Sequence, residues 1–232
     1  MRSIICKLIV FRHAESFDNS RGIFSGWRDS GLTLKGLSQA QEIAEQLKGC
    51  RIEYAFTSHL RRARKTLEIA LQDRPQVPVF MDDRLIERCY GLLQGKSKKS
   101  VANENPYWYA QIHRGFDFAP PEGESLRMVE KRVLSFLGQL KNWLGQTRGN
   151  VAISCHGNSK RPIRRVFEHL NMKQMLQLEN PQDQAMEYAL HIHRVNVDEV
   201  EEHRLEKDWH SVVVPSTVKL ATDPRNPLKQ YY

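Results

Sequence analysis

Two histidines and two arginines stand at or just after the ends of short apolar segments. Arg12 and His13 end the run LIVFRH. Arg62 follows the segment YAFTS by a few residues, and His156 ends NVAISCH. A neutral imidazole can attack phosphorus, and a guanidinium can hold two phosphate oxygens through parallel hydrogen bonds. Phosphoryl transfer depends mainly on positioning and on charge stabilisation, which arginines supply. These residue types therefore indicate chemistry on a phosphate group, provided that the fold brings them together.

Each of these residues has a simpler interpretation when it is taken alone. A single histidine after a strand is more often a core or capping residue than a nucleophile. Arg62 could be a solvent-exposed helix charge. Glu87 could form a surface ion pair with Arg84 or Arg88. A zinc site would also use histidines, but no H-x-x-x-H or acidic ligand spacing accompanies them, so zinc is disfavoured. The occurrence of two histidines at two strand ends favours the phosphate site.

The elements that must position these residues follow from the pattern of apolar side chains. Apolar runs predict strands at 4–11, 54–57, 77–81, 150–155 and 186–192. Helical spacing predicts a helix capped by Thr33 and ended by Gly49, and a second helix capped by Ser58. It also predicts a long helix over 124–144. A further helix is predicted from about Ser159, and Pro162 is tolerable only in its first turn.

Strands separated by helices predict an α/β fold, a three-layer sandwich in which helices cover both faces of a mostly parallel central sheet. Ligands bind such a sheet at the carboxyl ends of its strands, where the two histidines would lie. The helix near Ser159 would point free N–H groups toward the same edge. We treat residues 1–232 as one domain with a lid-like segment at about 89–121 and a polar C-terminal tail from about 198.

Composition limits the class of protein. Hydrophobic residues make up 40% of the chain and charged residues 27%, as in ordinary globular proteins. The four cysteines form no C-x-x-C pair, which is typical of a protein in the reducing cytoplasm. The apolar run at the N-terminus is too short to span a membrane. The formal net charge of +8 suits either nucleic acid or a small polyanion. Dispersed basic residues without interleaved aromatics disfavour nucleic acid.

The order of several short motifs resembles the histidine phosphatase superfamily and, within it, the cofactor-dependent phosphoglycerate mutases. The first motif, Arg12-His13-Ala14-Glu15-Ser16, is similar to the R-H-G-E-S signature of the superfamily. The other similar segments are, in the family's order, Phe24-Ser25-Gly26-Trp27, Leu32-Thr33-x-x-Gly36, Thr57-Ser58-x-Leu60-x-Arg62-Ala63, Glu87-Arg88-x-Tyr90-Gly91 and His156-Gly157-Asn158-Ser159. The resemblance spans about residues 5–190 and implies a phosphoglycerate mutase-like fold.

The resemblance also implies roles for the residues at matching positions. His13 would be the phosphorylated nucleophile, and Arg12, Arg62 and His156 would hold the phosphate. Glu87 would be the general acid and base that protonates the leaving oxygen and later deprotonates the incoming hydroxyl. The implied substrate-binding residues are Ser16, Asn19, Ser25, Gly26, Arg88, Tyr90, Lys98, His113, Arg114, Gly157 and Asn158.

The sequence departs from the mutase pattern at a few positions. Ala14 replaces the usual glycine of the first motif. His113 stands where mutases have the first of two paired arginines, which weakens the expected grip on the distal phosphate at neutral pH. Residues 181–186 lack the glycine expected after the fourth strand and its helix. These departures concern specificity more than the phosphoryl chemistry.

The resemblance implies a phosphoglycerate mutase that interconverts 3-phosphoglycerate and 2-phosphoglycerate, is primed by 2,3-bisphosphoglycerate and needs no metal. A mutase must retain its bisphosphorylated intermediate, so it requires cationic contacts beyond the transferred phosphate. The alternative within the superfamily is a phosphohydrolase of a small phosphoester. A non-catalytic binding protein is a further alternative, and Glu87 argues against it. The expected partner is a small phosphorylated substrate, with neither nucleic acid nor membrane, and the resemblance allows a homodimer.

Overall fold

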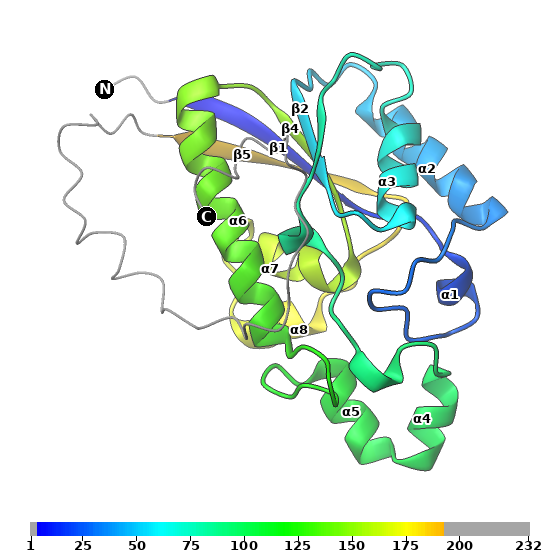
Figure 1. Ribbon diagram of the computed structural model, residues 1–232. Coiled ribbons are helices and arrows are strands. Elements are labelled where there is room, and N and C mark those ends of the chain that lie inside the picture. The colour runs from blue at the N-terminus through cyan, green and yellow to red at the C-terminus, as the bar shows by residue number, and fades with distance from the viewer. Residues whose placement is uncertain (1–3, 193–232) are drawn as a thin grey trace, which may run out of the picture.

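A five-stranded sheet organises residues 4–192, the part of the chain that the computed structural model describes (Figure 1). Its strands are β1 (Ile4–Arg12), β2 (Tyr54–Thr57), β3 (Val79–Met81), β4 (Val151–Cys155) and β5 (Ala185–Ile192). The strand order is β3-β2-β4-β1-β5, and only β5 runs antiparallel to its neighbour. The predicted α/β fold with a mostly parallel central sheet is confirmed.

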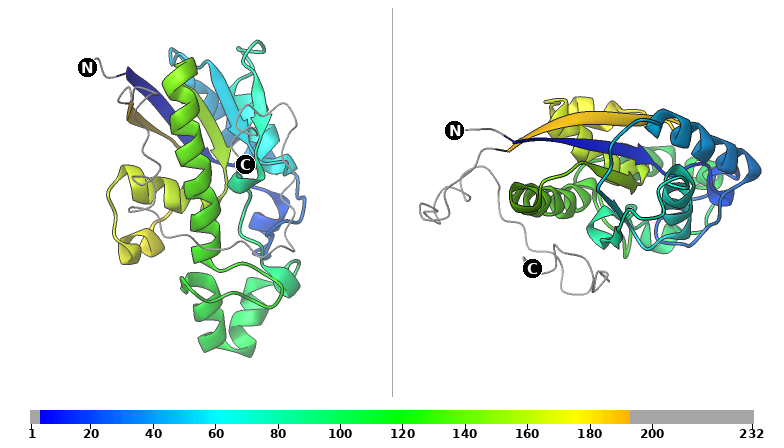
Figure 2. Two further views of the ribbon diagram at one scale, coloured as in Figure 1. Left: turned by 60° about the vertical axis from the view of Figure 1, so that its left-hand side comes forward. Right: turned by 90° about the horizontal axis from the view of Figure 1, so that it is seen from above.

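Helices cover both faces of this sheet. They are α1 (Phe17–Ser20), α2 (Leu34–Leu47), α3 (Arg61–Ala70), α4 (Lys98–Glu104), α5 (Pro106–Arg114), α6 (Leu126–Thr147), α7 (Gly157–Phe167) and α8 (Met172–Gln177), with short 3₁₀ turns η1 (Asp83–Leu85) and η2 (Gly91–Leu93). Figure 2 shows the long α6 lying along one face of the sheet. Within residues 4–192, none of the helices has the length and apolar character that crossing a bilayer requires.

The three layers follow from the alternation of side chains along the central strands. Leu8 and Val10 of β1 pack into the core beneath α6 and α7. Ile9 and Phe11 of the same strand pack into the core beneath α2 and α3. A strand that is buried on both faces reads as a continuous apolar run, which is why the sequence located β1 and β4 within about one residue.

Two helix starts agree with the sequence. The Oγ1 atom of Thr33 accepts a hydrogen bond from the Gly36 N–H at 3.0 Å and caps α2, as predicted. Ser125 caps α6 through the Met128 N–H, so this helix begins two residues after the predicted start and extends to Thr147. Both caps satisfy a backbone N–H group that the first helical turn leaves without a partner.

Two details of the predicted helices were wrong, and both lie at the sheet edge: the residue that caps α3 and the place of Pro162 in α7. Leu60, not Ser58, is the N-cap residue of α3, and no side chain caps this helix. The Ser58 hydroxyl instead lies 2.7 Å from Nε2 of His156. The helix expected from about Ser159 begins at Gly157, so Pro162 lies inside it rather than in its first turn. Proline lacks an N–H group, and α7 therefore has one hydrogen bond fewer at that point.

Residues 89–121, where we predicted a lid-like segment, form η2, α4 and α5 beyond the edge of the sheet (Figure 1). Their apolar side chains Tyr90, Leu93, Val101 and Ile112 form a cluster with Phe24, from the loop between α1 and α2. The cluster fixes this segment opposite the carboxyl ends of the strands. That it acts as a lid stays a prediction, and the tail predicted from about 198 lies outside the described residues.

Candidate active site

A cavity of about 220 Å³ lies at the carboxyl ends of β1 and β4, between the sheet and the segment that contains α4 and α5. Most of the residues singled out from the sequence line it. They are Arg12, His13, Asn19, Ser25, Gly26, Arg62, Glu87, Tyr90, Lys98, His113, Gly157 and Asn158. The fold therefore brings together groups that are separated by up to 146 residues, from Arg12 to Asn158.

The backbone orients the ring of His13, which directly follows β1 and is 1% exposed. Its backbone N–H donates to the Cys155 carbonyl at 2.8 Å, which ties the end of β1 to the end of β4. Nδ1 lies 2.8 Å from the Ala14 carbonyl. A carbonyl can only accept, so Nδ1 carries the proton and Nε2 keeps its lone pair. The Nε–H group of Arg62 donates to Nε2 at 3.2 Å. Nε2 is therefore the nitrogen available to attack.

Burial and nearby cations keep both imidazoles neutral. The pKa of His13 lies well below its usual range, mainly because the ring is buried and also because of the positive charges of Arg62 and Arg12. The pKa of His156 also lies well below its usual range, mainly because of burial and then because of Arg62 and His13. A neutral imidazole has the lone pair that nucleophilic attack requires. Both rings are therefore neutral at pH 7, each with one N–H group.

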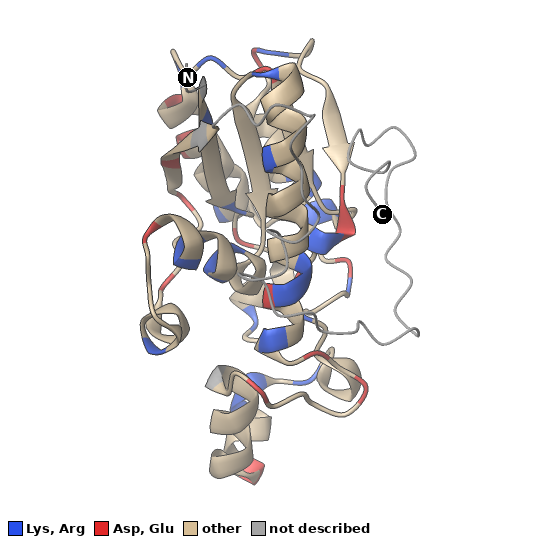
Figure 3. Ribbon diagram, turned by 90° about the vertical axis from the view of Figure 1, so that its left-hand side faces the viewer, with Lys and Arg blue, Asp and Glu red and all other residues tan. Residues whose placement is uncertain are grey.

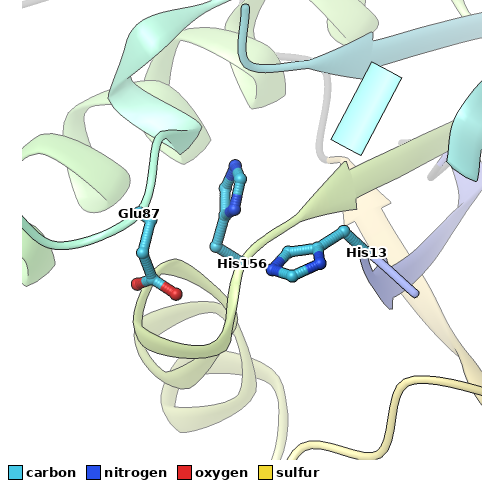
Figure 4. Close-up of side chains that lie close together, drawn as sticks. All are labelled: His13, Glu87 and His156. Carbon is cyan, nitrogen blue, oxygen red and sulfur yellow. The ribbon is translucent and has the colours of Figure 1, made fainter. Parts of the chain in front are cut away.

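His156 lies against His13 just behind the cavity, and Figure 4 shows the two rings with Glu87. The ring centroids of the two histidines are 5.0 Å apart. Ser58 holds Nε2 of His156, whereas its Nδ1 is buried and has no hydrogen-bond partner among the described residues. His156 is also the N-cap residue of α7, so the start of that helix sets its position.

Glu87 supplies a carboxylate to the same place and is 7% exposed. Its Oε1 atom accepts hydrogen bonds from the N–H groups of Arg88 at 2.8 Å and Asn158 at 3.2 Å. Neither bond uses Oε2. One ligand atom each of Glu87, His13 and His156 lies within 4.8 Å of the others. A proton can therefore pass between Glu87 and a group bound at His13.

Unpaired donors around the cavity favour an anion. Arg62 uses its two terminal nitrogens on the carbonyls of Arg28 and Gly26, at 2.8 and 2.7 Å. Arg12 donates from NH1 to the Asn180 carbonyl at 3.1 Å, while its buried Nε has no partner among the described residues. The Ser25 hydroxyl is buried without a partner in the same way. Buried donors are normally satisfied, and the oxygens of a phosphate would satisfy these.

The same trio could supply three ligands to a metal ion, but its surroundings favour an anion. Arg62 is fully buried and Arg12 is half-buried next to the trio, and a guanidinium stays protonated in proteins. Two fixed positive charges at this range repel a dication and attract a phosphate.

The outer part of the cavity is formed by Tyr90, which directly precedes η2, by Lys98 of α4 and by His113 of α5. The side-chain amide of Asn158 donates to the Tyr90 hydroxyl at 3.1 Å. Burial, followed by the charge of Glu87, raises the pKa of Tyr90, so this residue is a neutral phenol. Burial, followed by Arg12, lowers the pKa of Lys98. His113 stacks on Tyr109 with the ring centroids 5.3 Å apart. These groups face the strand ends from the opposite side.

Two predicted substrate-binding residues, Ser16 and Arg88, do not line the cavity, and the side chain of a third, Arg114, lies outside the described part of the structure. Ser16 lies beneath Asn19, where its hydroxyl accepts the Asn19 N–H at 3.4 Å and caps α1. Arg88 is fully buried and donates to the carbonyls of Glu124, Ile112 and Phe118 at 2.6, 2.6 and 2.8 Å. For Arg114, the last residue of α5, the structure describes only the backbone. Arg88 therefore joins segments of the chain and does not face the cavity.

We expect Arg88→Met to lower stability rather than substrate affinity. The change leaves three buried carbonyls without their donor, which costs on the order of 3–5 kcal/mol. Urea unfolding would measure this loss, and the KM of the remaining folded enzyme should stay close to that of the unaltered chain. Arg51→Met is the matched control, because Arg51 is 85% exposed and pairs only with Glu53 at the surface. A raised KM at unchanged stability would instead place Arg88 on the substrate.

Sequence reasoning missed several residues of the cavity, namely Ile23, Arg161, Glu179 and Asn180. Arg161 could have been found, because it lies one helical turn after Gly157 on the same face of α7. Glu179 and Asn180 precede β5, which pairs antiparallel to β1 so that Ala185 lies beside Phe11. This pairing brings the start of β5 to the end of β1. Apolar periodicity does not reveal the direction of a strand.

Lys160, in the second turn of α7, is a fully buried amine whose Nζ has no hydrogen-bond partner among the described residues. Burial is the largest cause that lowers its pKa to about 8, and the charges of Arg164 and Arg12 add to the effect. A lysine charged at pH 7 in this place carries an uncompensated desolvation cost. Lys160 is therefore expected to destabilise the fold at neutral pH.

We expect Lys160→Met to raise the free energy of unfolding at pH 7 by up to about 3 kcal/mol. The pKa of Lys160 is about 8 in the folded protein, below the ordinary lysine value of 10.5. The cost of burying the charge is therefore complete below about pH 8 and disappears as the pH rises toward 10.5. Urea unfolding at pH 7 and pH 10 should show the gain shrinking, and Lys141→Met, at an exposed position, should show neither effect. A gain that is equal at both pH values would contradict this account.

The fold and the cavity define an α/β protein with two neutral imidazoles and two guanidiniums at one polar site. Residues 8–201 match the family model of the Histidine phosphatase superfamily (branch 1), and the chain belongs to this superfamily. It is accordingly an enzyme of this class, either a phosphoglycerate mutase or a related histidine phosphatase.

Relatives within the superfamily carry both kinds of activity in their names. The chain is 36% identical over 180 residues to a 2,3-bisphosphoglycerate-dependent phosphoglycerate mutase of Parvibaculum lavamentivorans, covering 74% of this chain and 84% of that one. It is 36% identical over 177 residues to a phosphoglycerate mutase of Schizosaccharomyces pombe, with the same coverage. Among solved structures, an alpha-ribazole phosphatase from Shigella flexneri superposes with a TM-score of 0.69 at 25% identity, covering 79% of this chain and 93% of that one.

Proposed function

We propose that the protein is a 2,3-bisphosphoglycerate-dependent phosphoglycerate mutase that interconverts 3- and 2-phosphoglycerate through a phosphohistidine at His13. The observation that carries the proposal is a cavity with more basic side chains than a single phosphate requires. Arg12 and Arg62 line it together with His13, and Lys98 of α4 and Arg161 of α7 line it as well. A substrate that carries a second anionic group besides its phosphate fits this set of charges. Relatives named as mutases support the same function.

In this mechanism the phosphoryl group of the primer passes to Nε2 of His13. Arg12 and Arg62 hold its equatorial oxygens, and Nδ1 of His156, which has no hydrogen-bond partner among the described residues, would bind it too. The bond from phosphorus to the leaving oxygen breaks, and Glu87 donates the proton which that oxygen needs. In the return step Glu87 takes the proton of the acceptor hydroxyl while phosphorus leaves Nε2. The phosphoryl chemistry needs no metal, because the guanidiniums supply the positive charge.

The composition of the cavity wall supports a small, strongly polar substrate. Ile23 is the one aliphatic residue in a lining that is otherwise polar, charged, aromatic or glycine. A nucleobase or an acyl chain would find little apolar surface there. On the side of the molecule drawn in Figure 3, basic residues are spread over several helices and mixed with acidic ones. This distribution supports a small phosphoester rather than a nucleic acid as the partner.

The decisive experiment follows the fate of the phosphoryl group. The purified chain is incubated with 3-phosphoglycerate and a trace of 2,3-bisphosphoglycerate, and both 2-phosphoglycerate and free phosphate are measured. The proposal predicts fast isomerisation that depends on the primer, with little phosphate released. Phosphate release without isomerisation would overturn the mutase proposal and leave the phosphohydrolase, as in the alpha-ribazole phosphatase that shares the fold. Addition of EDTA should leave the rate unchanged.

The variant His113→Arg provides a second test of the same proposal. His113 lines the outer part of the cavity from α5. A permanent positive charge there should hold the bisphosphorylated intermediate longer. The ratio of isomerisation to phosphate release should therefore rise above that of the unaltered chain.

A further inference from the structure

Gln182 lies in the loop between α8 and β5, and its side chain contacts two elements of the site at once. Its Nε2 donates to the backbone carbonyl of His13 at 3.2 Å and to Oδ1 of Asn19 at 2.9 Å. His13 and Asn19 lie 169 and 163 residues away in the sequence. The residue does not line the cavity, so it would act through its neighbours.

The contact with Asn19 decides which end of that amide faces the cavity. Oδ1 of Asn19 accepts from Gln182 and also from the backbone N–H of Ser16, at 3.3 Å. An amide has one oxygen and one NH₂ group, so two donors on the oxygen leave the NH₂ group for other partners. Asn19 lines the cavity. Its NH₂ group is therefore presented to an anion there, whereas the reversed amide would present a repulsive oxygen.

The contact with His13 holds the peptide that carries the nucleophile. The backbone N–H of His13 donates to Cys155, and its carbonyl accepts from Gln182. The residue is thereby held from the sheet on one side and from the loop on the other. The loop itself is fixed by Gln46 of α2, whose side chain donates to the Asp183 carbonyl at 2.7 Å and accepts the Ala185 N–H at 2.9 Å.

We propose that Gln182 is a positioning residue that sets the amide of Asn19 and the peptide of His13 for binding of the phosphoryl group. This inference rests on the phosphoryl site proposed above and applies to a mutase and to a phosphohydrolase alike. Preorganised donors stabilise the charge of the transition state without reorganising during the reaction. The loss of Gln182 should therefore weaken the binding of a transition-state mimic most.

The test measures the binding of orthovanadate, a mimic of the phosphoryl group in transfer, by isothermal titration calorimetry. Gln182→Leu keeps the size of the side chain and removes its N–H donors. We expect this variant to bind vanadate about tenfold more weakly, the effect of losing one hydrogen bond to a polar group in the site. Gln184→Leu is the matched control, since Gln184 is an exposed glutamine of the same loop, and it should bind vanadate like the unaltered chain. Gln184→Leu should keep the Tm of the unaltered chain, whereas Gln182→Leu, which leaves the His13 carbonyl without its donor, should lower the Tm by a few degrees, so binding is measured at 25 °C, where both variants are folded.

A double-variant cycle shows whether Gln182 acts through Asn19. In the Asn19→Ala background, Gln182→Leu should cost about threefold or less, since only the His13 contact remains to be lost. Gln182→Glu should weaken vanadate binding more than Gln182→Leu does, because a carboxylate only accepts and forces the Asn19 amide to turn its NH₂ group away from the cavity.

Specific outcomes would overturn the inference. Equal vanadate affinity in Gln182→Leu and Gln184→Leu would show that the contact positions nothing. A full tenfold loss in the Asn19→Ala background would show that Gln182 does not act through Asn19. The readout is separate from the mutase question, because vanadate binding requires no turnover. If the unaltered chain failed to bind vanadate, the phosphoryl site itself would be refuted.

Discussion

The variant His13→Asn is expected to lose at least about 10⁴-fold in turnover, since removing a covalent nucleophile removes most of an enzyme's rate enhancement. Asparagine can keep the hydrogen bond that Nδ1 of His13 makes to the Ala14 carbonyl, so the loop should retain its shape. It has no nitrogen lone pair in place of Nε2. The variant should therefore fold, and it should bind vanadate measurably while forming no phosphoenzyme.

The phosphoenzyme itself can be measured directly. Brief incubation with ³²P-labelled primer, followed by quenching in alkali, should label the unaltered chain with an alkali-stable and acid-labile group. The variant His13→Asn should stay unlabelled. His113→Asn is the matched control, because this second histidine lines the same cavity from α5 and should leave the labelling intact. Labelling of the His13→Asn variant would place the nucleophile elsewhere.

The variant Glu87→Gln is expected to lose about 10²–10⁴-fold in kcat with substrates whose leaving group is an alkoxide, the usual contribution of a general acid. The amide oxygen can still accept the N–H groups of Arg88 and Asn158, so the geometry is retained. What is lost is the exchangeable proton. The loss should therefore depend on how much the leaving oxygen needs protonation.

Two substrates test this dependence. With p-nitrophenyl phosphate, whose leaving group departs as a stable anion, Glu87→Gln should lose far less activity than with phosphoglycerate. Glu179→Gln, which changes a second carboxylate in the lining of the same cavity, should affect the two substrates equally. An equal loss with both substrates in the Glu87 variant would argue that Glu87 holds the structure and transfers no proton.

Two kinds of information were contained in the sequence itself. The strands could be located because β1 and β4 are buried on both faces and therefore carry continuous apolar runs. The position of His13 and His156 at one edge then followed, since the carboxyl ends of parallel strands meet there. The types of residue at that edge were sufficient to indicate phosphate chemistry, and the motif order indicated the superfamily.

Only the tertiary structure decided how the other polar groups are used. Arg88 follows Glu87 directly in the sequence, yet its guanidinium binds three carbonyls while the Glu87 carboxylate faces the cavity. Ser58 holds His156 and caps no helix. Gln182 reaches His13 only because β5 pairs antiparallel with β1. Local sequence determines the conformation of neighbouring residues. It does not determine which way a side chain points or which acceptor a donor finds, because these depend on segments that are distant in the sequence and meet only in the folded chain.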